Sequence, residues 1–144
     1  METPDDFDLR DFLPYALNQA AEAASLAFQK QYRVRYGMLR TEWRVLFHLG
    51  RYGPMTATQI CARASLHKTK ISRAVHALEQ KRYLTRMAQE TDRRVEELCL
   101  TRQGGIVYRE LYEAARSYDA SLSAQFTPQE REILGRCLHK IARL

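Results

Sequence analysis

The run from Thr56 to Thr101 is the feature that most constrains the fold of this chain. It begins with Thr56 and Gln59, which have the spacing of a helix capping box. The pattern predicts a short helix that ends near Arg63, and a turn through residues 64–66 separates it from another helix. Two helices joined by so tight a turn are therefore expected at the centre of the chain.

The helix after this turn is predicted over residues 68–81, because apolar residues recur there at spacings of three and four. They are Ile71, Ala74, Val75 and Leu78. The opposite face carries side chains that donate or accept hydrogen bonds, and none is acidic: Thr69, Lys70, Ser72, Arg73, His76 and Gln80. One face is thus suited to a core and the other to a polar or anionic partner.

Residues 83–88 and 95–100 are predicted to form two strands around a polar turn. Leu98 and Leu100 alternate with Glu97 and Cys99, so one face of this hairpin can pack on a core. The turn has the sequence Thr91-Asp92-Arg93-Arg94, which places two arginines at the tip of the hairpin.

Two helices are predicted before this run. The first begins near Asp11 as N-cap, with Pro14 in its first turn, and Gly37 ends or bends it. The second begins with Thr41 as N-cap and stops at Gly53-Pro54. Glycine favours the C-terminal cap, and proline cannot continue a helix.

Two further helices are predicted after the hairpin. Thr101 caps a long helix, and the last helix opens with Thr127-Pro128-Gln129-Glu130, a capping box with proline at the first helical position. The apolar stripe of the last helix runs almost to the end of the chain: Ile133, Leu134, Cys137, Leu138 and Ile141. We expect a second copy of the chain to cover this stripe. The predicted fold class is mainly α with a small β-hairpin.

Positive charge is concentrated in the middle of the chain. The whole sequence has a net charge of +6 and a pI of about 9.4. Residues 1–30 have a net charge of −4, whereas residues 31–62 have +4, residues 63–102 have +5 and the remainder has +1. The basic segment coincides with the predicted helix pair and hairpin, which favours a polyanionic partner.

DNA suits the polar helix face. An α-helix fits the major groove, where Arg73 can read guanine through two hydrogen bonds and His76 can reach a base or a phosphate. Thr69, Lys70 and Ser72 suit phosphate contacts that fix the register of the helix on DNA. The alternative is that these residues form the ordinary solvated face of an amphipathic helix.

The hairpin tip suits a second groove of the same duplex. Asp92 can hold the guanidinium of a neighbouring arginine in a fixed direction while the other arginine enters a minor groove. The alternative is a flexible polar turn with a surface ion pair that contributes little. The cationic helix and the arginine-tipped hairpin together favour DNA binding over both alternatives.

The order of these elements resembles the MarR family of winged-helix transcription regulators, over residues 12–144. The most specific parts are the Asp-x-Arg of the wing (Asp92, Arg94) and the Leu-x-Leu-Thr of residues 98–101. Residues 68–73 and 41–46 also match, in the recognition helix and in the second helix.

This resemblance implies one domain over residues 1–144, with a winged helix-turn-helix lobe at 41–101 and flanking helices at 11–39 and 102–144 that form a dimerisation region. It implies a homodimeric repressor that binds a pseudo-palindromic operator in double-stranded DNA. A small ligand or oxidation would release it. The implied DNA-binding residues are Lys68, Thr69, Lys70, Ser72, Arg73, His76, Arg93 and Arg94, with Asp92 orienting the wing arginine.

Two positions depart from the family pattern. Arg82 stands where a glycine commonly follows the recognition helix, and it is strained by about 1 kcal/mol if its φ is positive. His67 occupies the expected N-cap of that helix, where serine or aspartate caps better.

A ligand pocket is predicted where the dimerisation helices meet the DNA-binding lobe. The candidates are aromatic or polar, and Arg44 or His48 would meet an anion: Tyr15, Asn18, Trp43, Arg44, Phe47, His48, Tyr108 and Tyr112. The resemblance implies an aromatic carboxylate, a phenolic compound or an aryl thioester as the ligand. The alternative is that the aromatic residues only pack against one another.

The three cysteines, Cys61, Cys99 and Cys137, stand at wide spacings without a Cys-x-x-Cys pair. Because there is also no signal peptide or long apolar run, we expect a reduced cytoplasmic protein without a membrane partner. All three thiols are expected to be buried as small hydrophobic groups. Thiol-based redox sensing is the alternative switch.

An enzyme is not predicted. The four histidines are scattered without zinc-binding spacing, and Gly104-Gly105 lacks the rest of a phosphate-binding loop. No metal or cofactor is expected. A basic protein that coats DNA without sequence preference is the main alternative, and it would bind any duplex with a steep salt dependence.

Overall fold

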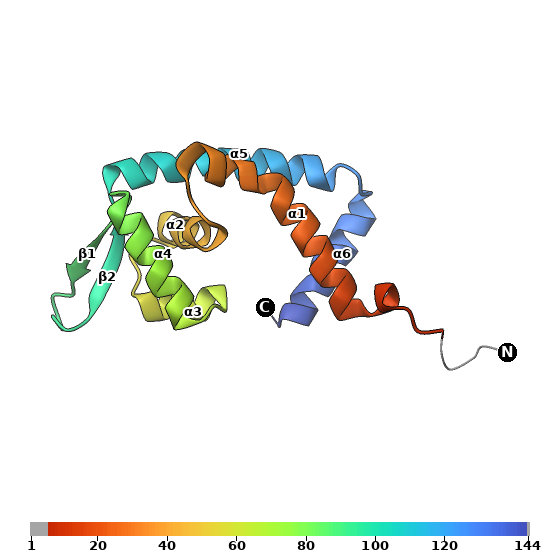
Figure 1. The fold of residues 1–144 in the computed structure, drawn as a ribbon, viewed down its shortest axis with the longest axis horizontal. Helices are drawn as coiled ribbons and strands as arrows, with labels where there is room; N and C mark the ends of the chain where they lie inside the picture. The colour runs from red at the N-terminus through yellow and green to blue at the C-terminus, as the bar shows by residue number, and fades with distance from the viewer. Residues whose placement is uncertain (1–5, 144) are drawn as a thin grey trace.

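The computed structural model describes residues 6–143. The elements in this range are the 3₁₀ helix η1 (Leu9–Asp11), α1 (Leu13–Tyr36), α2 (Arg40–Tyr52), α3 (Ala57–Ala64), α4 (Lys68–Gln80), β1 (Leu84–Ala88), β2 (Glu96–Leu100), α5 (Arg102–Ser123) and α6 (Pro128–Ala142). The long helix α5 spans the molecule, with α2, α3, α4 and the hairpin beneath one end and α1 and α6 at the other (Figure 1). The predicted fold class, mainly helical with a two-stranded antiparallel hairpin, is confirmed.

Three of the four helix starts assigned to a threonine cap are predicted correctly. At α3, the Thr56 hydroxyl accepts the Gln59 N–H at 3.1 Å, and the Gln59 side chain accepts the Thr56 N–H at 2.9 Å. Thr127 and Glu130 form the same reciprocal pair at the start of α6, and Thr101 caps α5. Both partners in these bonds lie within four residues of each other, so the sequence alone specifies them.

The predicted N-cap of the first helix is wrong by one residue, because Phe12 and not Asp11 is the N-cap of α1. Asp11 belongs to η1, which Asp8 caps by accepting the Arg10 N–H at 2.9 Å, and α1 begins only at Leu13. The Asp8 carboxylate also pairs with the Arg10 guanidinium at 2.8 Å, which stabilises a separate turn before the helix. The end of α1 is as predicted, because Gly37 adopts a left-handed φ of 65° and donates its N–H back to the helix.

The predicted N-cap of the second helix is also wrong. In place of the Thr41 hydroxyl, the carboxylate of Glu42 accepts the N–H of Leu39 at 2.8 Å, and α2 begins at Arg40. The Glu42 side chain is only 5% exposed, and it also accepts a hydrogen bond from Lys81 Nζ at 3.1 Å. A single buried carboxylate thus caps α2 and ties it to the end of α4.

The core lies between α2, α4 and the base of the hairpin. The apolar face of α4 is buried as predicted, and it packs against α2, where Val45 and Leu46 are fully buried. Leu98 of β2 exchanges two backbone hydrogen bonds with Met55, with N···O distances of 2.8 and 3.2 Å. The hairpin is therefore attached by its base to the chain just before α3.

The turn after α4 is strained, because an arginine occupies a position where the family that the sequence resembles commonly has glycine. Arg82 has a φ of 63°, in the left-handed region that side chains disfavour. Its carbonyl accepts the Thr101 hydroxyl at 2.7 Å, and the Tyr83 carbonyl accepts the Thr101 N–H at 3.0 Å. A Cβ added to Gly104 would lie 1.9 Å from the Tyr83 carbonyl oxygen, so α5 starts directly against this turn. These tertiary contacts hold the arginine in its unfavourable conformation.

We predict that Arg82→Gly stabilises the protein. Glycine removes a strain of about 1–2 kcal/mol but is about 0.4–1 kcal/mol more costly to order from the unfolded chain. The free energy of unfolding, measured by urea denaturation, should therefore rise by about 0.5–1 kcal/mol. Arg82→Ala keeps the positive φ and should give no gain. Equal stabilisation by alanine would show that the side chain, and not the backbone, is unfavourable here.

Candidate nucleic-acid interface

The helix pair at the centre of the chain presents the predicted polar face. Ser65, with a φ of 52°, turns the chain between α3 and α4, and His67 caps α4 by accepting the Thr69 N–H on its Nδ1 at 3.2 Å. Histidine therefore serves as the cap despite being a weaker choice than serine or aspartate. The side chains predicted to meet DNA are all exposed on α4: Lys68, Thr69, Lys70, Ser72, Arg73 and His76.

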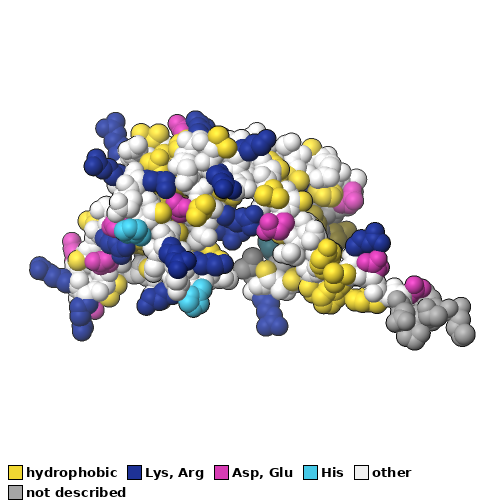
Figure 2. Space-filling view, in the orientation of Figure 1, with side chains coloured by type: hydrophobic (Ala, Val, Ile, Leu, Met, Phe, Trp, Pro, Cys, Tyr) yellow, Lys and Arg dark blue, Asp and Glu magenta, His cyan; other side chains and the backbone are white. Residues whose placement is uncertain are grey.

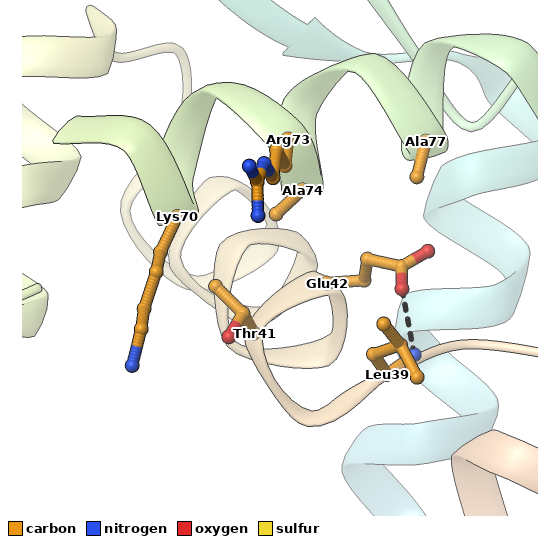
Figure 3. A pocket seen from close by; sticks show the side chains of 7 residues that line it. All are labelled: Leu39, Thr41, Glu42, Lys70, Arg73, Ala74 and Ala77. Atoms are coloured by element: carbon orange, nitrogen blue, oxygen red, sulfur yellow. Dashed lines mark hydrogen bonds between the residues drawn. The ribbon is translucent and has the colours of Figure 1, made fainter. Parts of the chain in front are cut away.

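Two cations of this face lie beside the first turn of α2 (Figure 3). Lys70 and Arg73 border a concavity of about 240 Å³ between α2 and α4, which Ala74 and Thr41 also line. Among residues 6–143, neither cation forms an ion pair with a carboxylate. Their charges are therefore available to an external anion.

The hairpin tip holds one of its arginines in place. β1 and β2 pair antiparallel from Leu84 opposite Leu100 to Ala88 opposite Glu96. Beyond this ladder, the Asp92 carboxylate accepts the backbone N–H of Arg94 at 3.0 Å and its Nε at 3.3 Å. The Arg94 side chain is 92% exposed, so Asp92 directs its stem while the guanidinium stays in solvent. Arg93 is also exposed.

One arginine near this surface was not singled out by its sequence pattern. Arg86 on β1 donates its Nε to Glu79 of α4 at 3.1 Å and an Nη to Glu96 of β2 at 3.4 Å. Arg86 and Glu96 lie on the same face of the hairpin as Leu98, so alternation along the two strands would have placed them together. The contact with Glu79 depends on how α4 meets β1, which alternation does not reveal.

The cationic side chains and the hairpin tip lie on one half of the molecule. The tip and the first turn of α4 point to the same edge, on the opposite side from α5 (Figure 1). Lys and Arg side chains gather over α2, α3, α4 and the hairpin, whereas apolar side chains gather over the first turns of α1 (Figure 2). A duplex lying along this edge would meet both the helix and the hairpin.

Four of the aromatic ligand candidates are close together. The ring of Phe47 lies 5.6 Å from that of Trp43, 5.5 Å from that of Tyr108 and 6.2 Å from that of Tyr112. Burial raises the pKa of the Tyr108 hydroxyl, and the neighbouring Tyr112 adds to the effect. These rings mostly pack against one another, and an open concavity of about 450 Å³ lies over Tyr108 and Tyr112.

The remaining ligand candidates do not all lie close to this aromatic cluster. Arg44 and His48 are half-buried on α2, and the His48 Nδ1 lies 2.6 Å from the Arg44 carbonyl oxygen. Tyr15 and Asn18 occupy the first turns of α1, whereas α1 meets Trp43 through Phe28. Ten or more residues of helix correspond to at least about 15 Å. A single chain therefore does not bring Tyr15 and Asn18 to the other six candidates.

The expectation that all three cysteines are buried is wrong. Cys137 is exposed on α6, and Cys61 and Cys99 are half-buried. Burial raises the pKa of the Cys99 thiol, with a further contribution from the Glu97 carboxylate. A raised pKa lowers the thiolate fraction and hence the reactivity of Cys99 towards oxidants. Cys137 is exposed because α6 lacks a covering element within the described part of the chain.

A long apolar groove runs between α1, α5 and α6. It has a volume of about 560 Å³ and is lined mainly by alanines and leucines, including Leu17, Leu122, Leu134 and Leu138. None of the described residues of α6 is buried, and Leu134 and Leu138 are 43% and 40% exposed. Within residues 6–143, no helix is long and apolar enough to cross a membrane.

These features define a winged helix-turn-helix fold, a fold class in which the second helix of the pair lies in the major groove of DNA. Residues 36–95 match the sequence profile of the MarR family. Over these residues the chain is similar to a family of DNA-binding transcription regulators, whose members are not enzymes. MarR regulators bind DNA operators as dimers.

Similar proteins span nearly the whole chain. YwoH of Bacillus subtilis, an uncharacterised HTH-type transcriptional regulator, is 25% identical over 83% of this chain and 86% of its own length. A MarR/EmrR family regulator from Acinetobacter sp. ADP1 has a TM-score of 0.85 at 24% identity, covering 95% of this chain and 96% of that one. BpsR of Bordetella bronchiseptica, whose DNA binding is regulated by 6-hydroxynicotinic acid, has a TM-score of 0.86 at 17% identity, with coverage of 96% and 98%.

Proposed function

We propose that this protein is a cytoplasmic, homodimeric repressor that recognises a pseudo-palindromic operator. The observation that carries the proposal is the exposed cationic face of α4 beside a hairpin whose Arg94 is held by Asp92. Residues 41–101 form the DNA-binding lobe in this proposal. Residues 11–39 and 102–144 form the dimerisation region.

The α4 face is assigned to the major groove. Arg73 has the donor geometry for guanine, and its guanidinium is not held by a carboxylate of the described chain. Lys68, Thr69, Lys70 and Ser72 lie on the first turns of α4, where phosphate contacts also gain from the positive end of the helix dipole. His76 lies one turn beyond Arg73 on the exposed face.

The hairpin is assigned to the minor groove. Asp92 limits the orientations of Arg94, so less conformational entropy is lost when the guanidinium enters a narrow groove of high negative potential. Arg93 is exposed beside it and is assigned to a phosphate.

We predict that the protein prefers the DNA upstream of its own gene to a shuffled duplex of equal length by about 10³-fold at physiological salt. Arg94→Ala should weaken operator binding by about tenfold to a hundredfold, with fold and dimer intact. Arg116→Ala removes the same charge from an exposed site on α5 and should bind like wild type. Fluorescence anisotropy titrations measure all three dissociation constants.

Wild-type affinity in Arg94→Ala would mean that the wing does not enter DNA. Equal binding to the upstream and shuffled duplexes would mean that the upstream DNA holds no operator. A specific operator would then be sought by selection from a pool of random sequences. Failure of that selection would identify a DNA-coating protein.

A second copy of the chain is the proposed occupant of the apolar groove. One protomer alone leaves the apolar stripe of α6 in water, which is unfavourable by about 25 cal/mol for each Å² of exposed apolar surface. A two-fold axis through this region would let each α6 cover the other protomer's groove. To read a pseudo-palindromic operator, the two α4 helices of this dimer must lie about 34 Å apart, one turn of DNA.

We predict that Leu138→Asp disrupts the dimer, because it places a charge in an apolar interface. Analytical ultracentrifugation should show a monomer, and operator affinity should fall as one half-site is lost. Val34→Asp introduces the same charge at an apolar residue that is 82% exposed and outside the groove, and it should stay dimeric. A dimeric Leu138→Asp variant with unchanged sedimentation would place the interface elsewhere.

The proposed ligand is an aromatic carboxylate, a phenolic compound or an aryl thioester. The cluster of Trp43, Phe47, Tyr108 and Tyr112 offers ring surface, and Arg44 and His48 offer polar groups for an anion. Regulation of BpsR by 6-hydroxynicotinic acid supports this ligand class. Tyr15 and Asn18 can join the cluster only from the second protomer.

We predict that a panel of aromatic acids, phenols and aryl thioesters contains a compound that raises the Tm and weakens operator binding. At 100 times its Kd, such a ligand stabilises the folded state by about 2.7 kcal/mol. Tyr112→Ala should lose this ligand-induced shift in Tm, whereas Phe7→Ala, at an exposed ring before η1, should keep it. A Tm and an operator affinity that ignore the whole panel would contradict the proposal.

A further inference from the structure

The triad of Glu79, Arg86 and Glu96 lies between the α4 face and the hairpin. Arg86 contacts a carboxylate of α4 through its Nε and a carboxylate of β2 through an Nη. All three side chains are partly exposed, at 36% for Glu79, 39% for Arg86 and 53% for Glu96. The contacts are thus on the surface and add little to folding stability.

The triad lies next to a proposed DNA-binding residue, Arg94. Arg86 and Glu96 line a concavity of about 330 Å³ between the start of α3 and the hairpin, together with Arg94 and Thr58. Glu79 belongs to the last turns of α4. Because Glu96 lines the same concavity as Arg94, a duplex that Arg94 contacts passes close to Glu96 and to the Arg86 that joins it to Glu79. Unpaired carboxylates repel phosphates over about 8–10 Å at physiological salt.

We propose that Arg86 is a positioning residue that screens Glu79 and Glu96 from DNA, rather than a phosphate contact. The inference rests on the proposed DNA-binding function. Arg86 acts through its two carboxylate partners: it offsets one of their two negative charges and so lowers the repulsion that a phosphate meets beside the cations of α4 and the wing.

The contrast with Arg94 supports this assignment. Arg94 has one carboxylate partner in its own turn, and its side chain is 92% exposed. Arg86 has two partners from two different elements and is 39% exposed. Two neighbouring carboxylates more than offset the charge of the Arg86 guanidinium, so its attraction to a phosphate is weaker than that of Arg94. Screening requires no direct contact with a phosphate.

Rescue by charge removal tests the proposal. Arg86→Gln alone should weaken binding to the duplex selected by the wild-type protein by about tenfold, because two carboxylates then face the phosphates. The triple variant R86Q/E79Q/E96Q should return to within about threefold of wild type. The double variant E79Q/E96Q should bind no more weakly than wild type. Anisotropy titrations at several salt concentrations give each affinity and its salt slope.

The matched control separates local screening from net charge. R86Q/E113Q/D119N removes the same two negative charges from exposed positions on α5, on the far side of the molecule from the hairpin tip. It should stay as weak as R86Q. Circular dichroism and Tm of every variant establish that the fold is retained, as expected for surface ion pairs.

Three results would overturn the proposal. A triple variant as weak as R86Q, with a salt slope lowered by about 0.9 per protomer, would make Arg86 a direct phosphate contact. If R86Q/E113Q/D119N regained as much DNA affinity as R86Q/E79Q/E96Q, the net charge of the protein would explain the rescue without local screening. Wild-type affinity of R86Q would show that no screening is needed.

Failure of the proposed function is distinguishable from failure of the screening. If the wild-type protein selects no duplex, the four variants are titrated on a generic 30-base-pair duplex at low salt, where the charge effects persist without sequence preference. If R86Q lost affinity for this generic duplex and the triple variant regained it, the screening role of Arg86 would stand and the proposed repressor function would be rejected.

Discussion

The buried carboxylate of Glu42 joins α2 to the end of α4, the helix that carries the proposed DNA-binding face. It caps α2 through the Leu39 N–H and neutralises Lys81 at the end of α4. A carboxylate that is only 5% exposed needs both partners, because an unpaired buried charge is strongly unfavourable. The pair therefore restricts the position of α4 relative to α2, and the exposed face of α4 takes its direction from this contact and from the core beneath it.

The molecule consists of a lobe with a complete core and a region whose apolar surface is left open. In the lobe, α2, α3, α4 and the hairpin base bury Leu46, Ile60, Ile71, Leu78 and Leu98 almost completely. In the second region, α6 buries none of its described residues. The division matches the proposed roles, since DNA recognition requires a rigid surface and dimerisation requires an apolar surface that one chain cannot cover.

Local patterns predicted the caps of α3, α5 and α6, where a threonine binds an amide three residues later. They also predicted the exposed side chains of α4 and the Asp92–Arg94 contact, because helical period and adjacency determine both. The predicted cap of α2 is wrong because Glu42 binds the Leu39 N–H in place of Thr41, although this bond is also local. What the sequence does not show is the second partner of Glu42, Lys81, which lies 39 positions away, or the contact of Arg86 with Glu79 of another element.

The sequence by itself determined the order of the helices, the hairpin, the polar face of α4 and the arginine tip, because periodicity and short-range hydrogen bonds specify these features. Tertiary structure alone decided that Glu42 is buried, that Glu79 pairs with Arg86 and which aromatic rings meet. It also decided that Arg82 is held at a positive φ by Thr101. These features depend on contacts between residues distant in sequence, and such contacts exist only once the elements have packed.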